Sequence, residues 1–201
     1  MPVPPLDPPP DPLALFKEWR ADAEACDTIQ YAGAMCLSTV APDGFPEGRI
    51  VLLHDSGPDG FAFFTDRRSA KGQSLAETPR AALTFYWGPL ERQVRVQGPV
   101  EPGTPTEADA FFDERPRRSK GTAWAAPQSQ PVTRSDLERR VREVDARFEE
   151  HASIPRPPDW QVYRVRPRSI EFWEARARRL HERVRCTRGE GERWTWERLV
   201  P

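Results

Sequence analysis

The segment Thr65-Asp66-Arg67-Arg68-Ser69-Ala70-Lys71 gathers a hydroxyl, two arginines and a lysine in one short loop. Ser69 has the residue type that caps a helix, and a helical run follows it. The first N–H groups of a helix lack partners, and the helix dipole is positive at that end, so a phosphate is favoured there. Charged loops are also often only solvated. The loop is therefore either an anion site or a solvated turn.

His181 is the second residue whose setting could support chemistry. Arg179 and Arg183 lie two residues to either side of it, so on a strand the three side chains would share one face. A lone histidine is more often structural than functional, and the spacing alone leaves both roles open. No second histidine or cysteine lies at the spacing of a metal ligand, so we expect no metal site.

The segment from Arg164 to Arg188 is strongly basic, with nine arginines and three glutamates. A basic strand pair can bind RNA, but this one lacks the aromatic ladder and glycine-rich loops of the common RNA-binding modules. The chain as a whole has 30 basic and 31 acidic residues, a formal charge of −1. We therefore expect neither a nucleic-acid nor a membrane partner.

The composition suits one globular domain, with 201 residues of which 37% are hydrophobic. No apolar stretch is long enough to span a membrane, and prolines stand where a signal peptide would need an apolar region. The three cysteines are far apart and form no CxxC motif, so a reduced chain is expected. P-loop, Rossmann and GxSxG motifs do not occur. These features predict a soluble, cytoplasmic protein.

The elements that must position the candidate residues follow from periodicity and turn chemistry. Residues 1–10 form a proline-rich leader that is expected to be flexible, and residues 11–201 form the domain. Asp11 and Pro12 begin a helix that ends near Cys26. Short apolar runs between Pro, Asp and Gly turns predict antiparallel strands over residues 34–40, 49–54, 61–65, 81–87 and 90–100, with a helix over 69–78.

The second half of the chain mixes helices and strands. Residues 105–125 predict helix with a break at Pro116. Leu137, Val141, Val144 and Phe148 form an apolar stripe, which we interpret as core packing of a helix. Three further strand-like runs cover residues 161–173, 179–187 and 193–199. About eight strands without β-α-β alternation predict an α+β fold, an antiparallel barrel with helices around it.

A series of short motifs runs through residues 11–201. They are Asp11-Pro12-Leu13, Arg49-Ile50-Val51-Leu52-Leu53, Ser69 to Gly72, Pro89-Leu90-Glu91-Arg92-Gln93-Val94, Arg115-Pro116-Arg117, Ala123-Trp124, Pro127-Gln128-Ser129-Gln130, Ile170-Glu171-Phe172-Trp173, Arg179-Leu180-His181 and Arg198-Leu199-Val200-Pro201. Their order resembles the pyridoxine/pyridoxamine 5′-phosphate oxidase family. The resemblance implies a mainly β, FMN-binding split-barrel fold with a C-terminal dimerisation segment at about residues 160–201.

The resemblance also implies a cofactor site for FMN. Arg49 and Lys71 match the residues that clamp the FMN phosphate, and the same site would be lined by Ile50, Val51, Leu52, Phe64 and Thr65. The positions that hold the flavin ring and its side chain are matched by Gln93, Gln128, Ser129, Trp173 and Arg183. In this family the flavin lies at a homodimer interface, so both subunits would complete each site.

The implied substrate site combines matches and departures. Arg179 and His181 match the pair that contacts the vitamin at the flavin face, and Arg115 and Ser119 match ligands of its phosphate. His54 and Phe111 replace a lysine and a tyrosine that normally touch that phosphate. Ala70 replaces an arginine beside Lys71, and Arg67 or Arg68 is the candidate substitute.

The function implied is oxidation of pyridoxamine or pyridoxine 5′-phosphate to pyridoxal 5′-phosphate, with O₂ as acceptor and H₂O₂ as by-product. Two alternatives stay open. One is a related FMN oxidase of a dihydrophenazine-type precursor, which the altered phosphate pocket favours and the retained Arg115, Ser119 and Arg-Leu-His motif oppose. The other is a non-catalytic protein that binds flavin or pyridoxal phosphate.

Overall fold

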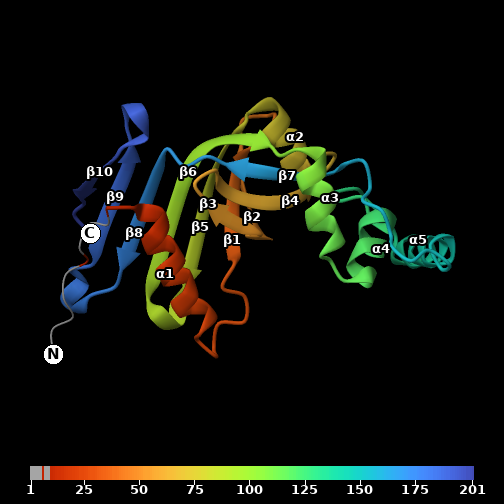
Figure 1. The fold of residues 1–201 in the computed structure, drawn as a ribbon, viewed down its shortest axis with the longest axis horizontal. Coiled ribbons are helices and arrows are strands. Elements are labelled where there is room, and N and C mark those ends of the chain that lie inside the picture. The colour runs from red at the N-terminus through yellow and green to blue at the C-terminus, as the bar shows by residue number, and fades with distance from the viewer. Residues whose placement is uncertain (1–5, 7–9) are drawn as a thin grey trace.

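A computed structural model describes residue 6 and residues 10–201. Its strands form one ten-stranded sheet in which the order β10-β9-β8-β6-β5-β1-β2 makes a curved wall (Figure 1). The strands are β1 (Ala34–Val40), β2 (Pro46–Leu52), β3 (Asp55–Gly57), β4 (Gly60–Asp66), β5 (Arg80–Trp87), β6 (Arg92–Pro102), β7 (Trp160–Val165), β8 (Ser169–Glu174), β9 (Glu182–Arg188) and β10 (Trp194–Arg198). All the pairings are antiparallel. The expected split-barrel architecture is confirmed.

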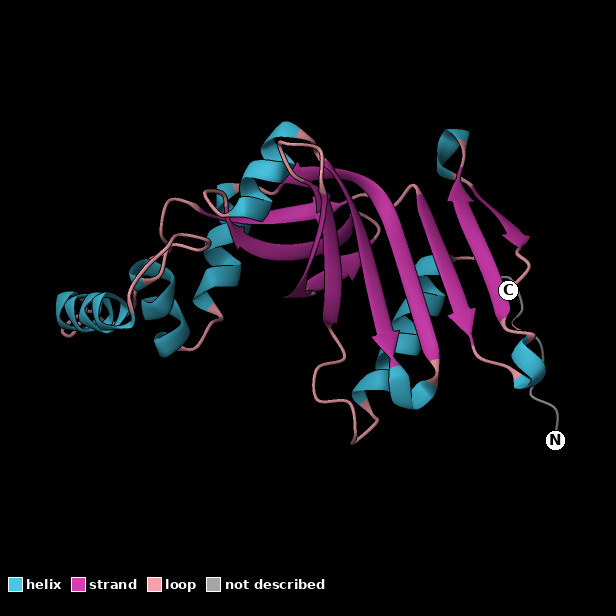
Figure 2. Ribbon diagram, turned by 180° about the vertical axis from the view of Figure 1, so that it is seen from behind, coloured by secondary structure: helices cyan, strands magenta, loops and turns pink. Residues whose placement is uncertain are grey.

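The helices are α1 (Pro12–Glu24), α2 (Ala70–Glu77), α3 (Pro105–Asp113), α4 (Arg117–Ala125) and α5 (Arg134–Arg147). The Asp11 carboxylate accepts a hydrogen bond from the Leu13 N–H at 2.9 Å and so caps α1, as predicted. Phe16 of α1 packs its ring against Phe61 at 4.8 Å and Phe85 at 5.0 Å between centroids. This helix therefore covers one face of the sheet, while no helix of the described residues lies on the other face of β6, β8 and β9 (Figure 2).

The long strand β6 joins the two parts of the sheet. Its residues 92–97 pair with β8, and its residues 100–102 pair with β7. Gly98 lies between them, where a Cβ would come within 1.7 Å of the carbonyl oxygen of Arg166. The backbone N–H groups of Arg166 and Arg168 donate to Pro99 and Gln97 at 2.9 and 2.8 Å. The chain thus crosses β6 closely at a position that only glycine fits.

That crossing corrects one prediction. Residues 161–173 were expected to form one strand, but they form β7 and β8, separated by residues 166–168. Pro167, at the crossing, has no N–H to donate to a neighbouring strand. Both β7 and β8 pair with β6, but the second partner of β7 is β4 and that of β8 is β9. The strands also begin and end at slightly different residues from those predicted, with β2 at Pro46–Leu52 and β6 at Arg92–Pro102, and the three-residue β3 was not predicted.

Helices α3, α4 and α5 extend from one end of the sheet (Figure 1). Pro116 separates α3 from α4, as predicted. The predicted core stripe of α5 is wrong for Leu137, Val141 and Val144, which stay half-exposed, and right for Phe148, which is buried against Trp124. The three side chains stay half-exposed because α5 packs on α4 at the edge of the molecule and not on the sheet.

Most of the predicted leader, residues 1–5 and 7–9, lies outside the described residues. Leu6 packs against the core, and its carbonyl accepts a hydrogen bond from Arg198 Nη2 at 3.1 Å. Within the described residues, no helix has both the length and the apolar character that crossing a lipid bilayer requires.

Candidate active site

One cleft brings together the two residues predicted to clamp the FMN phosphate and two of those predicted to hold the flavin ring and its side chain. Arg49 from β2, Lys71 from the first turn of α2 and Gln128 and Ser129 from the loop after α4 all line it. Lys71 Nζ donates to Gln128 Oε1 at 2.7 Å, and the buried Thr65 hydroxyl donates to the same oxygen at 3.2 Å. The cleft is further lined by Ile50, Val51, Leu52 and Phe64. Residues far apart in sequence therefore meet at one place.

Hydrogen bonds fix the start of α2 against the loop after α4 at this cleft. Ser69 caps the helix, with its hydroxyl accepting from the Gly72 N–H at 3.2 Å. The Ala70 N–H donates to the Ser129 hydroxyl at 3.2 Å. Ser129 has a φ of 65°, a left-handed conformation that non-glycine residues adopt mostly where the surrounding structure demands it. The loop is thus held so that Ser129 faces the helix start.

The electrostatics of the cleft favour an anion. Burial, and next the charge of Arg49, hold the pKa of Lys71 below its usual value, with Asp66 opposing them. Arg49 Nη2 contacts Glu47 Oε2 at 2.6 Å, and its Nη1 donates to the Thr39 hydroxyl at 2.7 Å. Two neighbouring cations at a helix start would both be stabilised by a phosphate dianion.

Arg67 and Arg68 do not replace the cation that Ala70 lacks. Arg67 Nε contacts Asp159 at 2.6 Å, and Arg68 forms hydrogen bonds of 2.9 and 3.1 Å to the buried carboxylate of Asp66. Burial would raise the pKa of Asp66, but these Arg68 contacts bring it below its usual value. Neither arginine lines the cleft. Neighbouring carboxylates thus hold both side chains away from the cleft.

The other end of the cleft is aromatic. The rings of His54 and Phe111 lie 3.9 Å apart between centroids, and Phe64 packs on both. His54 Nε2 lies 4.0 Å from a carboxylate oxygen of Glu114. His54, Phe111 and Arg115 line the cleft, whereas Ser119, on α4, does not. Three of the four predicted phosphate-side residues are therefore brought together.

Arg115 is the least satisfied cation of this region. Its guanidinium lies 4.7 Å from the centroid of the Trp160 ring, and burial lowers its pKa. Its buried Nε has no hydrogen-bond partner within the described part of the chain. Sequence reasoning missed Trp160 and Glu114, which also line the cleft. Glu114 could have been noticed as the neighbour of Arg115, but nothing local in the sequence marks Trp160.

A second cluster lies on β6, β8 and β9. Gln93 pairs with Trp173 and Trp173 with Arg183, so the three predicted flavin-ring residues form one row across the sheet. Trp173 packs against His181 at 4.8 Å between ring centroids. The Arg176 N–H donates to His181 Nδ1 at 3.2 Å, so a neutral imidazole carries its proton on Nε2.

The predicted strand face of His181 is corrected. The strand begins at Glu182, and Arg179 lies in a short 3₁₀ turn with a left-handed φ of 61°. Arg179, His181 and Arg183 therefore do not alternate on one strand, although they remain close in sequence. The left-handed residues Arg178 and Arg179 break the extended backbone that the spacing argument assumed.

The two clusters are separate within one chain. The row runs over β6, β8 and β9, and β5 and β1 stand between β6 and β2, so at about 4.8 Å per strand spacing the row lies roughly 14 to 24 Å from β2 along the sheet. The phosphate-side residues and the Trp173 row therefore do not meet within one subunit.

A curled antiparallel sheet with a cationic cleft at one edge and an aromatic–arginine row on a distant open face defines a split-barrel protein. Family models match residues 21–174, as pyridoxamine 5′-phosphate oxidase, and residues 160–201, as the pyridoxine 5′-phosphate oxidase C-terminal dimerisation region. The chain belongs to the pyridoxamine 5′-phosphate oxidase family. Membership confirms the expected enzyme class, an oxidase with FMN as cofactor, and a dimerisation region at the C-terminus.

Curated relatives agree with this assignment. A pyridoxine/pyridoxamine 5′-phosphate oxidase of Caulobacter vibrioides is 49% identical over 199 residues, covering 98% of this chain and 88% of the relative. One of Nostoc punctiforme is 47% identical over 192 residues, covering 95% and 89%.

Solved structures share the fold. PhzG from Burkholderia lata, in complex with tetrahydrophenazine-1-carboxylic acid, superposes with a TM-score of 0.89 at 31% identity, covering 97% of this chain and 95% of that one. An FMN-binding, pyridoxamine 5′-phosphate oxidase-related protein of Nostoc punctiforme gives a TM-score of 0.77 at 18% identity, covering 95% and 98%.

Proposed function

We propose that this enzyme oxidises pyridoxamine or pyridoxine 5′-phosphate to pyridoxal 5′-phosphate in a homodimer whose two FMN sites are each shared between subunits. The observation that carries the proposal is the cleft in which Lys71, Arg49, Gln128 and Ser129 converge on the start of α2. Such a cradle suits the phosphate of FMN. The names of the curated relatives support the choice of substrate.

The shared site follows from the separation of the two clusters. Gln93, Trp173 and Arg183 lie on an open sheet face that belongs largely to the C-terminal dimerisation region. In the proposed dimer this row would meet the partner's cationic cleft and close over the flavin ring. Arg115 and the His54–Phe111 wall would then hold the substrate from one subunit, while Arg179 and His181 would approach it from the other.

The protein's own part in the reaction is positioning. FMN, when bound, supplies the acceptor that takes a hydride from the substrate and passes two electrons to O₂ as H₂O₂. For the amine, water enters and ammonia leaves, so the atoms balance. The buried, unpartnered Nε of Arg115 would donate to a substrate phosphate oxygen. His181 would present Nε2–H to the substrate's polar groups, because its Nδ1 is already occupied.

Oxygen consumption by the purified protein tests the proposal. FMN-loaded protein is mixed with pyridoxamine 5′-phosphate, and O₂ uptake, H₂O₂ and the absorbance of pyridoxal 5′-phosphate are followed together. We expect all three to change in equal amounts. Protein that binds FMN but consumes no O₂ with either vitamer would instead support a non-catalytic flavin-binding protein.

A related oxidase of a tricyclic amine is the second candidate. The observation that favours it is the aromatic wall of Phe64, Phe111 and His54, together with the likeness to PhzG. Assay of a dihydrophenazine carboxylate in parallel separates the two. A turnover number divided by KM that is higher for the tricyclic compound than for both vitamers would make it the better account.

A further inference from the structure

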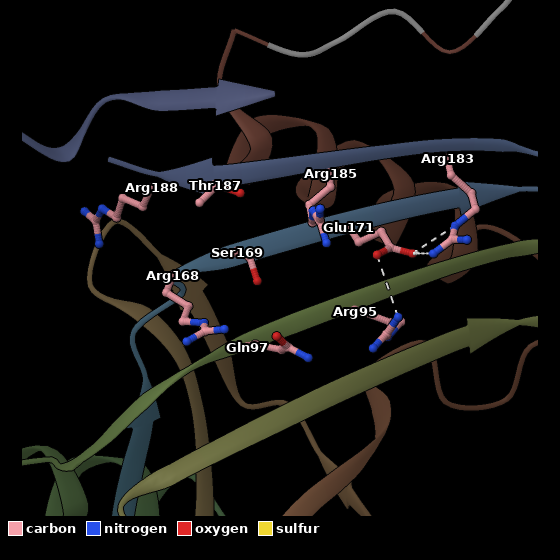
Figure 3. A pocket seen from close by; sticks show the side chains of 9 residues that line it. All are labelled: Arg95, Gln97, Arg168, Ser169, Glu171, Arg183, Arg185, Thr187 and Arg188. Atoms are coloured by element: carbon pink, nitrogen blue, oxygen red, sulfur yellow. Dashed lines mark hydrogen bonds and ion pairs between the residues drawn. The ribbon is translucent and has the colours of Figure 1, made fainter. Parts of the chain in front are cut away.

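Glu171 is a nearly buried carboxylate on the open face of β6, β8 and β9. Its residue is 9% exposed, while the surrounding side chains of the pocket on this face include Arg95, Arg183 and Arg185 (Figure 3). Glu171 Oε1 accepts hydrogen bonds from Arg183 Nη2 at 2.8 Å and Nε at 3.2 Å, and Oε2 lies 3.7 Å from Arg95 Nη1. It is the one carboxylate among the side chains that line this pocket.

The contacts of Arg183 fix the orientation of its guanidinium. The group has five N–H bonds in a rigid plane. Glu171 accepts two of them, and the carbonyl of Val200 accepts one from Nη1 at 3.1 Å. In the part of the chain that the structure describes, this leaves one N–H on each terminal nitrogen for a ligand. Each of these two remaining donors is available to an acceptor on the ligand.

The surrounding backbone holds this arrangement in place. The Leu199 N–H donates to the carbonyl of Arg183 at 2.9 Å, which ties the C-terminal residues to β9 and places the Val200 carbonyl beside the guanidinium. Glu171 pairs with Arg185 across β8 and β9, while Trp173 is the partner of Arg183. The contact between Glu171 and Arg183 is therefore diagonal. It joins Glu171 to the neighbouring row of Gln93, Trp173 and Arg183, the residues predicted to hold the flavin ring.

We propose that Glu171 is a positioning residue that orients Arg183 toward the flavin ring and offsets part of the positive charge of Arg183. The proposal rests on the proposed function, because it takes Arg183 to be a flavin contact. A nearly buried carboxylate loses hydration, and pairing with arginine offsets that loss without clear gain in stability over an apolar side chain. A role in placing Arg183 gives this carboxylate a purpose that packing alone does not.

The chain supplies a matched control in the next ion pair along the same strand. Arg185 donates to Glu197 Oε1 through Nε at 2.9 Å and Nη2 at 2.7 Å, which is the same two-donor arrangement. The Glu197 side chain is 56% exposed, and Arg185 is not among the flavin-site residues. Replacing Glu197 therefore removes an equivalent pair from the same face without touching Arg183.

The test uses Glu171→Ala, Glu171→Gln, Arg183→Ala and Glu197→Ala, each as full-length apoprotein titrated with FMN by fluorescence. We expect Glu171→Ala and Arg183→Ala each to raise the Kd for FMN about tenfold or more. The variant that carries both substitutions should have a Kd close to that of Arg183→Ala, because each substitution removes the same Glu171–Arg183 pair. Glu171→Gln keeps the accepting oxygen, so its Kd should stay within about threefold of wild type. Glu197→Ala should match wild type.

The reduction potential of bound FMN gives a readout that a structural role would not move. Glu171→Gln leaves the charge of Arg183 less compensated, which favours the reduced, anionic flavin. We expect this variant to favour reduced over oxidised FMN tenfold more than the wild type does, which corresponds to a reduction potential about 30 mV higher. If Glu171→Ala does not fold, this measurement on Glu171→Gln decides, and an unchanged potential refutes the proposal.

The outcomes separate this proposal from the proposed function. If the wild type binds no FMN, both the positioning role and the proposed function are wrong. If it binds FMN and Arg183→Ala weakens binding while Glu171→Ala behaves like Glu197→Ala, only the positioning role is wrong. Light scattering on each variant shows whether a raised Kd comes from loss of the dimer, which would also overturn the positioning role.

Discussion

Lys71 is the residue on which the phosphate end of the cleft most depends. It is half-buried, its ammonium group donates to neutral oxygens of Gln128 and Ser69 at 2.7 and 3.3 Å, and the charge of Arg49 lowers its pKa further. A cation in this setting gains more from a bound dianion than a solvated lysine would.

We expect Lys71→Ala to weaken FMN binding by about 10- to 150-fold, because a charge-assisted hydrogen bond contributes about 1.5–3 kcal/mol. Fluorescence titration of the apoprotein measures this. Lys17→Ala, on the exposed face of α1, is the control and should leave the Kd unchanged. Equal Kd values for the two variants would show that the phosphate lies elsewhere.

The lowered pKa of Lys71 also predicts a pH dependence of the apoprotein. Between the folded and unfolded pKa values of Lys71 the unfolded chain binds more protons, so its contribution makes stability rise with pH across that alkaline window, and the gain is absent at lower pH. Lys71→Met should flatten the rise in a series of thermal melts. An unchanged slope would contradict the assignment. FMN binding should show the opposite trend, weakening as Lys71 loses its proton.

Phe111 and His54 line the end of the cleft that receives the substrate in the proposed function. Glu114, 4.0 Å away, opposes the phosphate, and Arg115 attracts it.

His54→Lys combined with Phe111→Tyr should lower KM about tenfold, a difference of about 1.4 kcal/mol. The effect on kcat should be smaller, since a remote phosphate contact acts on substrate and transition state alike. Steady-state kinetics on both vitamers check this. An unchanged KM, with ready turnover of a tricyclic amine, would favour the second candidate function.

At the scale of elements, local patterns predicted the parts of the fold that local chemistry decides. The Asp11 cap, the Ser69 cap and the Pro116 break follow from residue types alone, and the structure has all three where expected. The crossing at residues 166–168 is decided by contact with Gly98, which is distant in sequence, so periodicity could not reveal it.

The same contrast between local patterns and long-range contacts explains which parts of the candidate site the sequence predicts. The motif resemblance identified residues that the cleft does bring together, such as Arg49, Lys71 and Gln128. It could not indicate that Asp159 holds Arg67 and Arg68, because the approach of Asp159 follows from how β4 and β7 pair. The left-handed backbone at Arg179 is likewise set by the turn and not by residue spacing.

Gly98→Ala should be strongly destabilising, because its Cβ would come within 1.7 Å of a backbone oxygen that cannot move without breaking the crossing. Overpacking typically costs about 1–3 kcal/mol, and a backbone clash lies at or above the upper end. Denaturant unfolding measures the loss. Gly57→Ala, with nothing within 4 Å of its added Cβ, is the control, and comparable stability of the two variants would refute the close crossing.

At the scale of the molecule, the proposed sharing of each site between subunits would make flavin binding a property of the dimer. Each chain holds a cationic cleft at β2 and the row of Gln93, Trp173 and Arg183 on β6, β8 and β9, roughly three to five strand spacings away. In the proposed two-fold dimer the cleft of each subunit faces the row of its partner, which gives two equivalent sites. Dimer assembly and FMN binding are then thermodynamically linked.

Subunit mixing tests this arrangement directly. Lys71→Ala and Arg183→Ala each damage both sites of their own homodimer. In a mixed dimer, one site carries both substitutions, and the other takes Lys71 from one subunit and Arg183 from its partner, so it is intact. Random exchange makes about half of the dimers mixed, so about a quarter of all sites should regain tight FMN binding.

The experiment is run at an FMN concentration that leaves each single variant mostly empty. The two variants are unfolded together, refolded as a mixture and titrated, with each variant refolded alone as the control. Recovery near a quarter of sites supports sharing between subunits. If both residues served one site within the same chain, every site in the mixture would carry one of the two substitutions, and mixing would restore nothing.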